Sequence, residues 1–381
     1  MSGKCEVNVK RLIPVIAFAA LAVAAQVVSF AVGKEFCLTQ LTMAVYYAIV
    51  VMGLCLLMGF AGQVSLGHGA FFAIGGYTSA VLTTSDFSRF EDSAWIAALK
   101  RAHVLYLKAD LYGGEVLAAT PWAAFLAAMA MTFFIACLIG YPALRLKGHY
   151  LAMATLGFGL IVYKMVLGSS ITGSADGITG VPEWKLFFGL TVSGKSALRV
   201  QNYYIACAVA LLLLVLLMNL VQSRVGRALQ AIHDRETAAG AIGINTARYK
   251  LSAFVLSALI AAAAGVFLTH YNGGIGPSEA STLKSVRYVA LAAAGGHGES
   301  VGRGVGEYDH QFPVLAGLVR FLRQCGLWRR LDCHYFAGPT GAAETLGPLD
   351  QADHRWHTCT EERRSCHSLK FRTSPIALAG S

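Results

Sequence analysis

A glycine-rich run between residues 59 and 77 holds three polar side chains, Gln63, Ser65 and His68, within an otherwise apolar stretch. Glycine permits helix breaks, and irregular backbone inside a bilayer requires either surrounding protein or a water-filled path. Two interpretations therefore stand with equal weight: close packing of small residues, and the lining of a path for a polar solute. The candidate path residues are Gly62, Gln63, Ser65, Gly67 and His68.

A second run, residues 223–245, combines basic residues with a stretch of small side chains. Glu236 favours the positive end of a helix dipole and Gly243 supplies a stop, so a short helix is predicted at 236–242. The stretch lacks a strong apolar face, which favours docking into a groove on a partner protein over lying on lipid. We call this segment the docking loop; its assigned residues are Arg235, Glu236, Thr237, Ala238, Ala239, Gly240, Gly243 and Asn245.

The remaining reactive residue types give no catalytic or metal-binding pattern. His68 has no second histidine or carboxylate at metal-ligand spacing, and the Gly295-Gly296 pair lacks the Lys-Ser/Thr of a phosphate loop. A zinc site near the C-terminus is the competing interpretation, but the two-residue spacings of common zinc modules are missing. Its candidate ligands are Cys325, Cys333, His334, Cys359, Cys366 and His367. We predict no cofactor, no catalytic residue and no enzymatic activity.

Long apolar segments must position these polar residues. The chain is 56% hydrophobic and 14% charged over 381 residues, which is too apolar for a soluble fold of this size. An all-α, polytopic membrane protein is predicted, with about eight transmembrane helices of bilayer-crossing length. The predicted spans are 12–32, 38–59, 66–82, 121–144, 150–167, 202–221, 249–270 and 286–295.

The basic residues predict the orientation of the chain. The net charge is +10, and its basic excess lies mainly in short segments between spans. Outside the docking loop, these basic residues are Lys4, Lys10 and Arg11 before the first span, Arg145 and Lys147 between two later spans, and Arg248 and Lys250 directly after the docking loop. All of them fall on one side if 66–82 crosses the membrane, so that side and the N-terminus are predicted to be cytoplasmic. The first span lacks a signal-peptide cleavage site and is expected to remain as an anchor.

Two polar loops, 83–120 and 168–201, are predicted on the outer side. The second contains the glycine-rich turn 172–180, whose Gly and Asp residues suit tight turns with positive φ. This turn is interpreted either as a docking surface for an outside partner or as an ordinary loop.

Several ordered motifs resemble one known family. Residues 61–68, Ala-Gly-Gln-Val-Ser-Leu-Gly-His, look like the signature of the branched-chain amino acid ABC importer permeases. Segments 144–158 and 173–180 resemble the LivM-type subunit in particular. Within the docking loop, residues 236–245 resemble the "EAA" loop through which such permeases engage their ATPase. The resemblance covers roughly residues 12–296.

The resemblance implies a permease subunit of an ATP-driven importer that moves branched-chain amino acids across the bacterial inner membrane. The implied partners are a LivH-type permease, two cytoplasmic ATPase subunits that hydrolyse the ATP, a periplasmic solute-binding protein and membrane lipid, without nucleic acid. A urea or short-amide permease has the same architecture and is the alternative. From a different class, the alternatives are a non-functional truncated product and a membrane protein with a novel soluble tail domain.

The membrane pattern stops after Gly296, and residues 297–381 hold Arg, Cys and His in no periodic order. Codons that encode residues 297–303, read one base later, can give Met-Gly-Ser-Pro-Trp-Gly-Ala, which resembles the family pattern. The same shift over 326–337 permits an apolar span that ends in Leu-Pro. We therefore predict two domains, a transmembrane permease at 1–296 and an aberrant, frameshifted and disordered tail at 297–381.

Overall fold

The computed structural model describes residues 9–31, 36–86, 105–109, 115–144, 146, 148–186 and 189–296. All of these residues belong to one compact unit, Met1–Trp328. The predicted tail at 297–381 lies outside the described residues, as do Arg145 and Lys147. The predicted domain boundary at 296/297 therefore stays a prediction.

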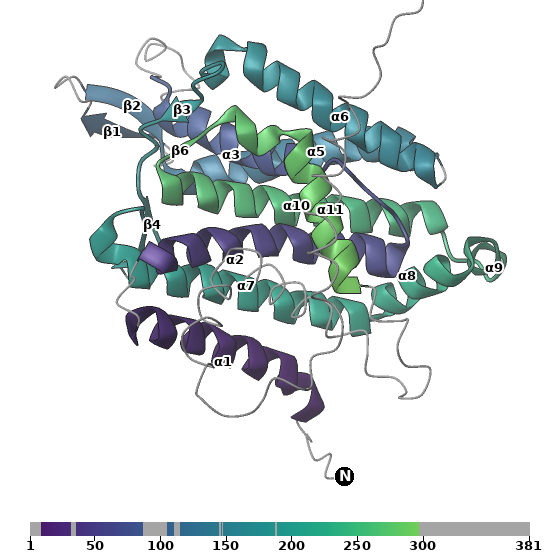
Figure 1. The fold of residues 1–381 in the computed structure, drawn as a ribbon. Coiled ribbons are helices and arrows are strands. Elements are labelled where there is room, and N and C mark those ends of the chain that lie inside the picture. The colour runs from purple at the N-terminus through teal and green to yellow at the C-terminus, as the bar shows by residue number, and fades with distance from the viewer. Residues whose placement is uncertain are drawn as a thin grey trace, which may run out of the picture. The chain divides into compact units, whose positions relative to one another are not determined.

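The described residues are mainly helical, as predicted (Figure 1). The helices are α1 (Val9–Ala31), α2 (Phe36–Cys55), α3 (His68–Thr84), α5 (Pro121–Ala143), α6 (His149–Gly168), α7 (Arg199–Gln222), α8 (Arg224–Asp234), α9 (Glu236–Ala241), α10 (Thr246–Asn272) and α11 (Thr282–Gly296). Shorter helical turns are the π-helical η1 (Leu56–Phe60) and the 3₁₀ turns η3 (Ser170–Thr172), η5 (Ser196–Leu198) and η6 (Pro277–Ala280).

Five of the predicted spans are helices long and apolar enough to cross a membrane among the described residues. They are Phe36–Phe60, Pro121–Ala143, His149–Gly168, Ser196–Gln222 and Thr246–Asn272. The other three predicted spans also form helices, α1, α3 and α11, but α3 and α11 have only 17 and 15 residues. The total of eight transmembrane helices therefore stays a prediction.

Short strands connect the helices. The loop predicted at 83–120 contains an antiparallel hairpin, β1 (Leu105–Ala109) with β2 (Glu115–Ala119), which was not predicted from the sequence. In the second outer loop, β4 (Trp184–Lys185) pairs with β5 (Thr191–Val192). The strand β3 (Ile178–Thr179) pairs with β6 (Gly274–Ile275), so the glycine-rich turn is tied to the chain that follows α10.

Helix α10 lies at the centre of the described bundle and packs against α2, α3 and α5. Small residues allow this close approach: a Cβ placed on Gly265 would lie 2.1 Å from the carbonyl oxygen of Phe72 on α3. A Cβ on Gly75 would similarly lie 2.5 Å from the carbonyl oxygen of Ala262. Since lipid is as apolar as a protein core, close backbone packing of this kind is a main source of helix association in membranes.

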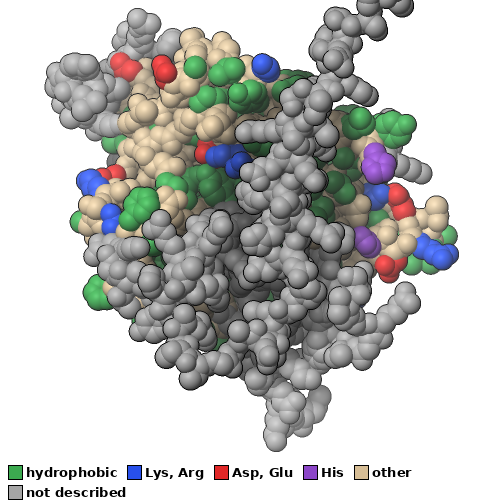
Figure 2. Space-filling model, viewed as in Figure 1, with side chains coloured by type: hydrophobic (Ala, Val, Ile, Leu, Met, Phe, Trp, Pro, Cys, Tyr) green, Lys and Arg blue, Asp and Glu red, His purple; other side chains and the backbone are tan. Residues whose placement is uncertain are grey.

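Apolar side chains also cover the outside of the bundle. Phe134 on α5, Met153 on α6 and Leu212 on α7 are each at least 60% exposed, as expected for surfaces that contact lipid. Charged side chains instead gather near the ends of the bundle, and Figure 2 shows such a group where Figure 1 draws α8 and α9.

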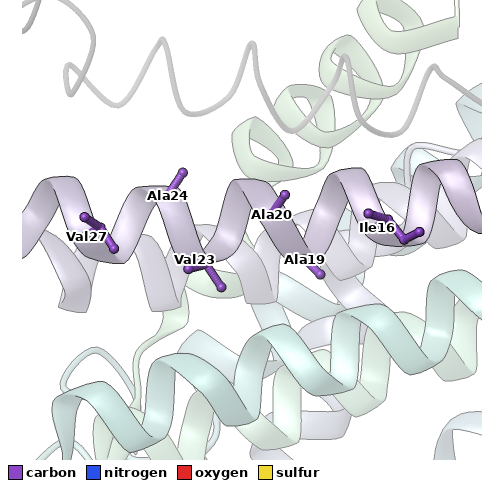
Figure 3. Close-up of a pocket in the computed structure, with 6 residues that line it drawn as sticks. All are labelled: Ile16, Ala19, Ala20, Val23, Ala24 and Val27. Carbon is purple, nitrogen blue, oxygen red and sulfur yellow. The ribbon is translucent and has the colours of Figure 1, made fainter.

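An open hollow of about 680 Å³ runs along α1 (Figure 3). Its lining residues are Ile16, Ala19, Ala20, Val23, Ala24 and Val27. All six of these side chains are apolar and belong to a single helix, so among the described residues none that lines the hollow could orient a polar solute.

Candidate functional site

The candidate path residues lie in a break between α2 and α3. Helix α2 widens into the π-helical turn η1, and the chain then leaves the helix until α3 begins. Gly62 adopts a φ of +64°, a conformation that favours glycine. The N–H of Gln63 donates to the carbonyl oxygen of Leu57 at 3.2 Å, and the N–H of Leu66 donates to the Thr155 hydroxyl of α6 at 3.0 Å. Polar contacts from two helices therefore hold the break in place.

His68, the first residue of α3, is fully buried and joins three helices. Its Nε2 lies 2.7 Å from the Ser257 hydroxyl of α10, and that hydroxyl donates to the carbonyl oxygen of Gly53 on α2 at 2.6 Å. Because the single hydroxyl hydrogen is used on Gly53, Nε2 must carry the hydrogen donated to Ser257. Nδ1 is then a buried acceptor without a partner among the described residues.

The two other predicted polar residues of the break are also buried. Gln63 is 4% exposed and Ser65 is 0% exposed. Among the described residues, the Gln63 Oε1 atom has no hydrogen-bond partner. Buried polar groups without partners cost free energy, and they are more common at functional sites than in ordinary cores. The assignment of these residues to a path stays a prediction.

The docking loop forms two helices in the structure. The first, α8, begins after Ser223, whose hydroxyl accepts the N–H of Val225 at 3.1 Å. Its buried residues Gly226, Leu229 and Ile232 fall on one face, so α8 packs against the bundle. The second helix, α9, spans Glu236–Ala241 and was expected at 236–242.

The predicted helix stop at Gly243 is present, with a φ of +88°. Around it, the N–H of Gly243 bonds to Gly240 and the N–H of Ile244 bonds to Ala239, a pattern that satisfies the last carbonyls of α9. Ala239 is buried, whereas the other side of α9 is exposed, with Ile242 74% exposed beyond its end. A short helix with one free side is therefore presented at the surface.

An ion pair fixes α9 to the next span. The Glu236 carboxylate lies 2.6 Å from the Lys250 ammonium of α10. Glu236 also stands in the first turn of α9, where a carboxylate is favoured by the helix dipole. Asn245, another docking-loop residue, caps α10 by accepting the N–H of Arg248 at 3.2 Å. These contacts connect the position of α9 to that of α10.

The structure brings the two predicted segments together, a contact that was not predicted from the sequence. A Cβ placed on Gly62 would lie 2.8 Å from Nδ1 of His233, near the end of α8. The break between α2 and α3 therefore lies directly against the docking loop. No periodicity in the sequence could have indicated a contact between residues so far apart in the chain.

The glycine-rich outer turn adopts the predicted left-handed conformations. Gly173, Gly177 and Gly180 have φ values of +74°, +73° and +76°, and Ser174 has a φ of +51°. A Cβ on Gly177 would lie 2.3 Å from the carbonyl oxygen of Ile275 in β6. The turn thus lies tightly on the chain that follows α10.

A buried histidine helps to hold this outer end. The Ser79 hydroxyl of α3 and Nε2 of His270 on α10 lie 2.9 Å apart. Nδ1 of His270 lies 2.9 Å from the carbonyl oxygen of Pro182, which can only accept, so Nδ1 carries the hydrogen. Trp184 covers this histidine, with ring centroids 5.4 Å apart. The second outer loop is therefore packed onto the ends of two helices.

A charged cluster between α2 and α11 was not predicted from the sequence. The Lys284 ammonium pairs with the Glu279 carboxylate, and both lie next to the Tyr47 hydroxyl. The available signal was the presence of Glu279 and Lys284 beside the apolar stretch that was assigned as the last span. The cluster includes Tyr47 of the span Phe36–Phe60, and charges at membrane depth are rare and commonly functional.

Among the described residues, no group of three or more His, Cys, Asp or Glu side chains could hold a metal ion. His68 and His270 instead bond to serine hydroxyls or a backbone carbonyl.

Comparison with known proteins identifies the family. Residues 36–308 match the family described as branched-chain amino acid transport system / permease component. The chain belongs to this permease family. The matched range includes every described element from α2 to α11.

The permease is similar to curated transport proteins of enteric bacteria. It is 30% identical over 277 residues to the high-affinity branched-chain amino acid transport system permease protein LivM of Escherichia coli, covering 68% of this chain and 58% of that protein. It is 25% identical over 270 residues to the LivH protein of Salmonella typhimurium, covering 70% of this chain and 79% of that protein. The chain thus spans 58% of the length of its LivM relatives. No solved structure matches it.

The family and the apolar helices together make this chain a multi-pass membrane protein. In the permease, the break, the docking loop and the outer turn are held by contacts to α10. The predicted resemblance to LivM-type proteins is confirmed.

Proposed function

We propose that this permease is a subunit of an ATP-driven importer that moves branched-chain amino acids across the bacterial inner membrane. The observation that carries the proposal is the contact between His233 of the docking loop and Gly62 of the break. It gives a family permease a contact between a surface helix and the segment that carries the buried Gln63 and Ser65 side chains.

The proposed assembly pairs this subunit with a LivH-type permease, two cytoplasmic ATPases and a periplasmic solute-binding protein. The permease itself hydrolyses no ATP. Helix α9 enters a groove on one ATPase, and ATP binding there moves α9. The Glu236–Lys250 ion pair and the His233–Gly62 contact then pass the movement to α10 and to the break. Such a movement alternates access to a central path.

The candidate path residues Gly62, Gln63, Ser65, Gly67 and His68 take part at this break. Gln63, Ser65 and His68 are buried in the described arrangement, so we assign them to segments that rearrange during alternation. The Gln63 Oε1 and His68 Nδ1 atoms have no hydrogen-bond partner in the part of the chain that the structure describes, which supports this role because a second arrangement can provide the missing hydrogen bonds.

The orientation follows from the docking loop. Helices α8 and α9 face the cytoplasm, where the ATPases bind, and the N-terminus lies on the same side. The exposed arginines Arg224, Arg227 and Arg235 support this orientation, since cytoplasmic segments of inner-membrane proteins are rich in Lys and Arg. The glycine-rich turn lies on the periplasmic side and is available to the solute-binding protein.

The reading frame after residue 296 is part of the proposal. A shifted frame there would replace residues 297–381 with a continuation of the permease. Resequencing the DNA that encodes residues 294–303 tests this point. An extra base would support the shift, and an unchanged sequence would assign the tail to the protein.

Reconstitution of the full chain with its proposed partners in proteoliposomes tests the transport function. We expect ATP-dependent uptake of radiolabelled leucine, isoleucine and valine. Urea and acetamide serve as competing solutes of the alternative class. Preferential uptake of either would overturn the amino-acid assignment, and a failure of the ATPases to co-purify with the chain would contradict the importer assignment.

A further inference from the structure

We infer that Tyr47, Tyr77, Glu279, Lys284 and Tyr288 form a binding site for a zwitterionic α-amino acid near mid-membrane depth. The inference rests on the proposed transport function and specifies where the permease would hold its solute. It places this site between α2, α3, η6 and α11, apart from the break at 61–67.

The depth of the cluster follows from Tyr47, which is the twelfth of the 25 residues in the span Phe36–Phe60. Two charged groups, Glu279 and Lys284, therefore lie at the level where the span is half crossed. They come from a discontinuity between two helices, because α10 ends at Asn272 and α11 begins only at Thr282. Discontinuous helices at this depth are a common way to build solute sites in transporters.

The two charges are partly buried and held together. The side chains of Lys284 and Glu279 are 24% and 15% exposed. The Tyr47 hydroxyl lies 3.2 Å and 3.3 Å from the two carboxylate oxygens of Glu279, and Nζ of Lys284 lies 3.3 Å from the same hydroxyl. Partial exposure leaves each charge accessible to a small solute, whereas a fully enclosed pair would be purely structural.

Two further hydroxyls adjoin the cluster without partners of their own. Tyr77 on α3 and Tyr288 on α11 are each 4% exposed, and their hydroxyls have no hydrogen-bond partner among the described residues. The Tyr288 ring lies 6.0 Å from the Tyr47 ring, and α3, which carries Tyr77, packs against η6, which carries Glu279. Leaving a buried hydroxyl unpaired is unfavourable, so a ligand that bonds to both would recover free energy.

The chemistry of the cluster matches a zwitterion. A ligand carboxylate fits the Lys284 ammonium and the tyrosine hydroxyls, and a ligand ammonium fits the Glu279 carboxylate. The Tyr47 ring adds a face for the ammonium, since it already accepts Lys284 at 5.2 Å from its centroid. One positive and one negative group together disfavour ligands with a net charge of either sign.

An apolar wall stands beside the charged groups. The rings of Phe72 and Tyr288 each lie 6.0 Å from the ring of Tyr47, measured between centroids. Phe72 is fully buried and Tyr288 is 4% exposed, so an aliphatic side chain would reach these rings only if they separated to admit it. The cluster therefore suits an amino acid with an apolar side chain.

The contact between α11 and α3 fixes the geometry. The backbone N–H of Gly69 donates to the Ser285 hydroxyl at 3.1 Å, and a Cβ on Gly69 would lie 2.4 Å from that hydroxyl. Lys284 and Tyr288 flank Ser285 on α11, so this close approach sets where both side chains meet α2.

Direct binding tests the inference without requiring transport. The full chain, purified with its partner permease in detergent, is titrated with tritiated leucine in a scintillation proximity assay, without ATP or solute-binding protein. We expect saturable binding, and we expect Tyr77→Phe and Tyr288→Phe each to raise the half-saturating concentration about tenfold, because each loses one ligand hydrogen bond.

Tyr46→Phe is the matched control for these substitutions. Tyr46 directly precedes Tyr47 on α2, and its buried hydroxyl also has no partner among the described residues. Its ring stacks on Phe267 of α10. Binding should be unchanged in this variant. Equal weakening by Tyr46→Phe and Tyr288→Phe, or unchanged binding in Tyr288→Phe, would overturn the inference.

A second variant tests the class of ligand. Lys284→Gln should weaken leucine binding but leave competition by leucinamide, which lacks the carboxylate, unchanged or stronger. Equal loss for both ligands would show that Lys284 serves only the structure. A wild-type chain that imports leucine but binds none in this assay would overturn the site and leave the proposed function intact. Absence of uptake with intact leucine binding would instead count against the function alone.

Discussion

The imidazole of His233 occupies the space in which a side chain at Gly62 would lie, because a Cβ on Gly62 would be only 2.8 Å from Nδ1. Gly62 also has a φ of +64°, so its conformation favours glycine, and a Cβ there would fit only if the exposed His233 side chain moved. The docking loop and the break between α2 and α3 therefore meet at a point where neither can change without affecting the other.

Replacing Gly62 with alanine tests this contact. We expect Gly62→Ala to lower the apparent unfolding temperature and to abolish coupling, because the positive φ costs about 1 kcal/mol or more and the methyl group collides with His233. The measurement is thermal unfolding in detergent together with leucine-dependent ATP hydrolysis in the assembled importer.

Gly180→Ala is the control, because Gly180 has a φ of +76° but a Cβ placed on it would meet no atom of the described residues within 4 Å. It should show the conformational cost without loss of coupling. Adding His233→Ala to Gly62→Ala should restore part of the coupling. Equal effects of the two glycine substitutions on coupling would argue against the contact.

The hydrogen-bonded chain from His68 through Ser257 to Gly53 should contribute to stability. Ser257→Ala leaves the Nε2 hydrogen of His68 without an acceptor in a buried setting, so we expect a loss of about 1–3 kcal/mol. Thermal unfolding of the purified chain measures it. Ser252→Ala on the exposed side of the same helix is the control and should change little. Similar unfolding temperatures for the two variants would disprove a stabilising role for this chain.

Much of the fold could be predicted from the sequence. Hydropathy located the spans that became α2, α5, α6, α7 and α10, because each lipid-facing helix needs an uninterrupted apolar stretch. The helix stop at Gly243 and the tight turn at 172–180 could also be predicted, because glycine readily adopts the positive φ values that such positions need.

The contacts between distant segments could not be predicted in the same way. Tyr47 and Glu279 are 232 positions apart, and nothing in either local pattern indicates that they meet. His233 similarly reaches Gly62 only through the packing of α8 against the bundle. The β1–β2 hairpin was missed because its surroundings are polar and it lies within a long loop.

The ion pair between Glu183 and Lys195 should make the stability of the fold depend on pH, through the second outer loop. The hydrogen bond from Lys195, at 2.6 Å, holds the pKa of the Glu183 carboxyl below its usual range. Because the folded pKa is the lower one, the pair stabilises the fold above the ordinary carboxyl pKa, and this contribution is lost as the pH falls through the folded value.

We therefore expect Glu183→Gln to have a slightly lower unfolding temperature than the wild type at neutral pH. The difference should disappear between about pH 5 and pH 3. The effect is small because both side chains are more than one third exposed. Thermal unfolding at several pH values measures it, and a difference that stays constant down to pH 3 would rule out this pair as the cause.

The exposed end of α9 should decide whether an ATPase binds. Ile242 is 74% exposed beside a helix of small residues, so it can enter a partner's groove without a change in the fold of the permease. Ile242→Asp places a charge in that groove, and we expect co-purification of the ATPase to fall at least tenfold while the unfolding temperature of the chain is unchanged.

Ile171→Asp is the matched control, because Ile171 is 72% exposed but lies in the outer loop. Since both substitutions add the same charge to an equally exposed isoleucine, a difference between them isolates the position of α9. Retention of the ATPase by Ile242→Asp, or an equal loss in both variants, would show that the docking loop is not where the ATPase attaches.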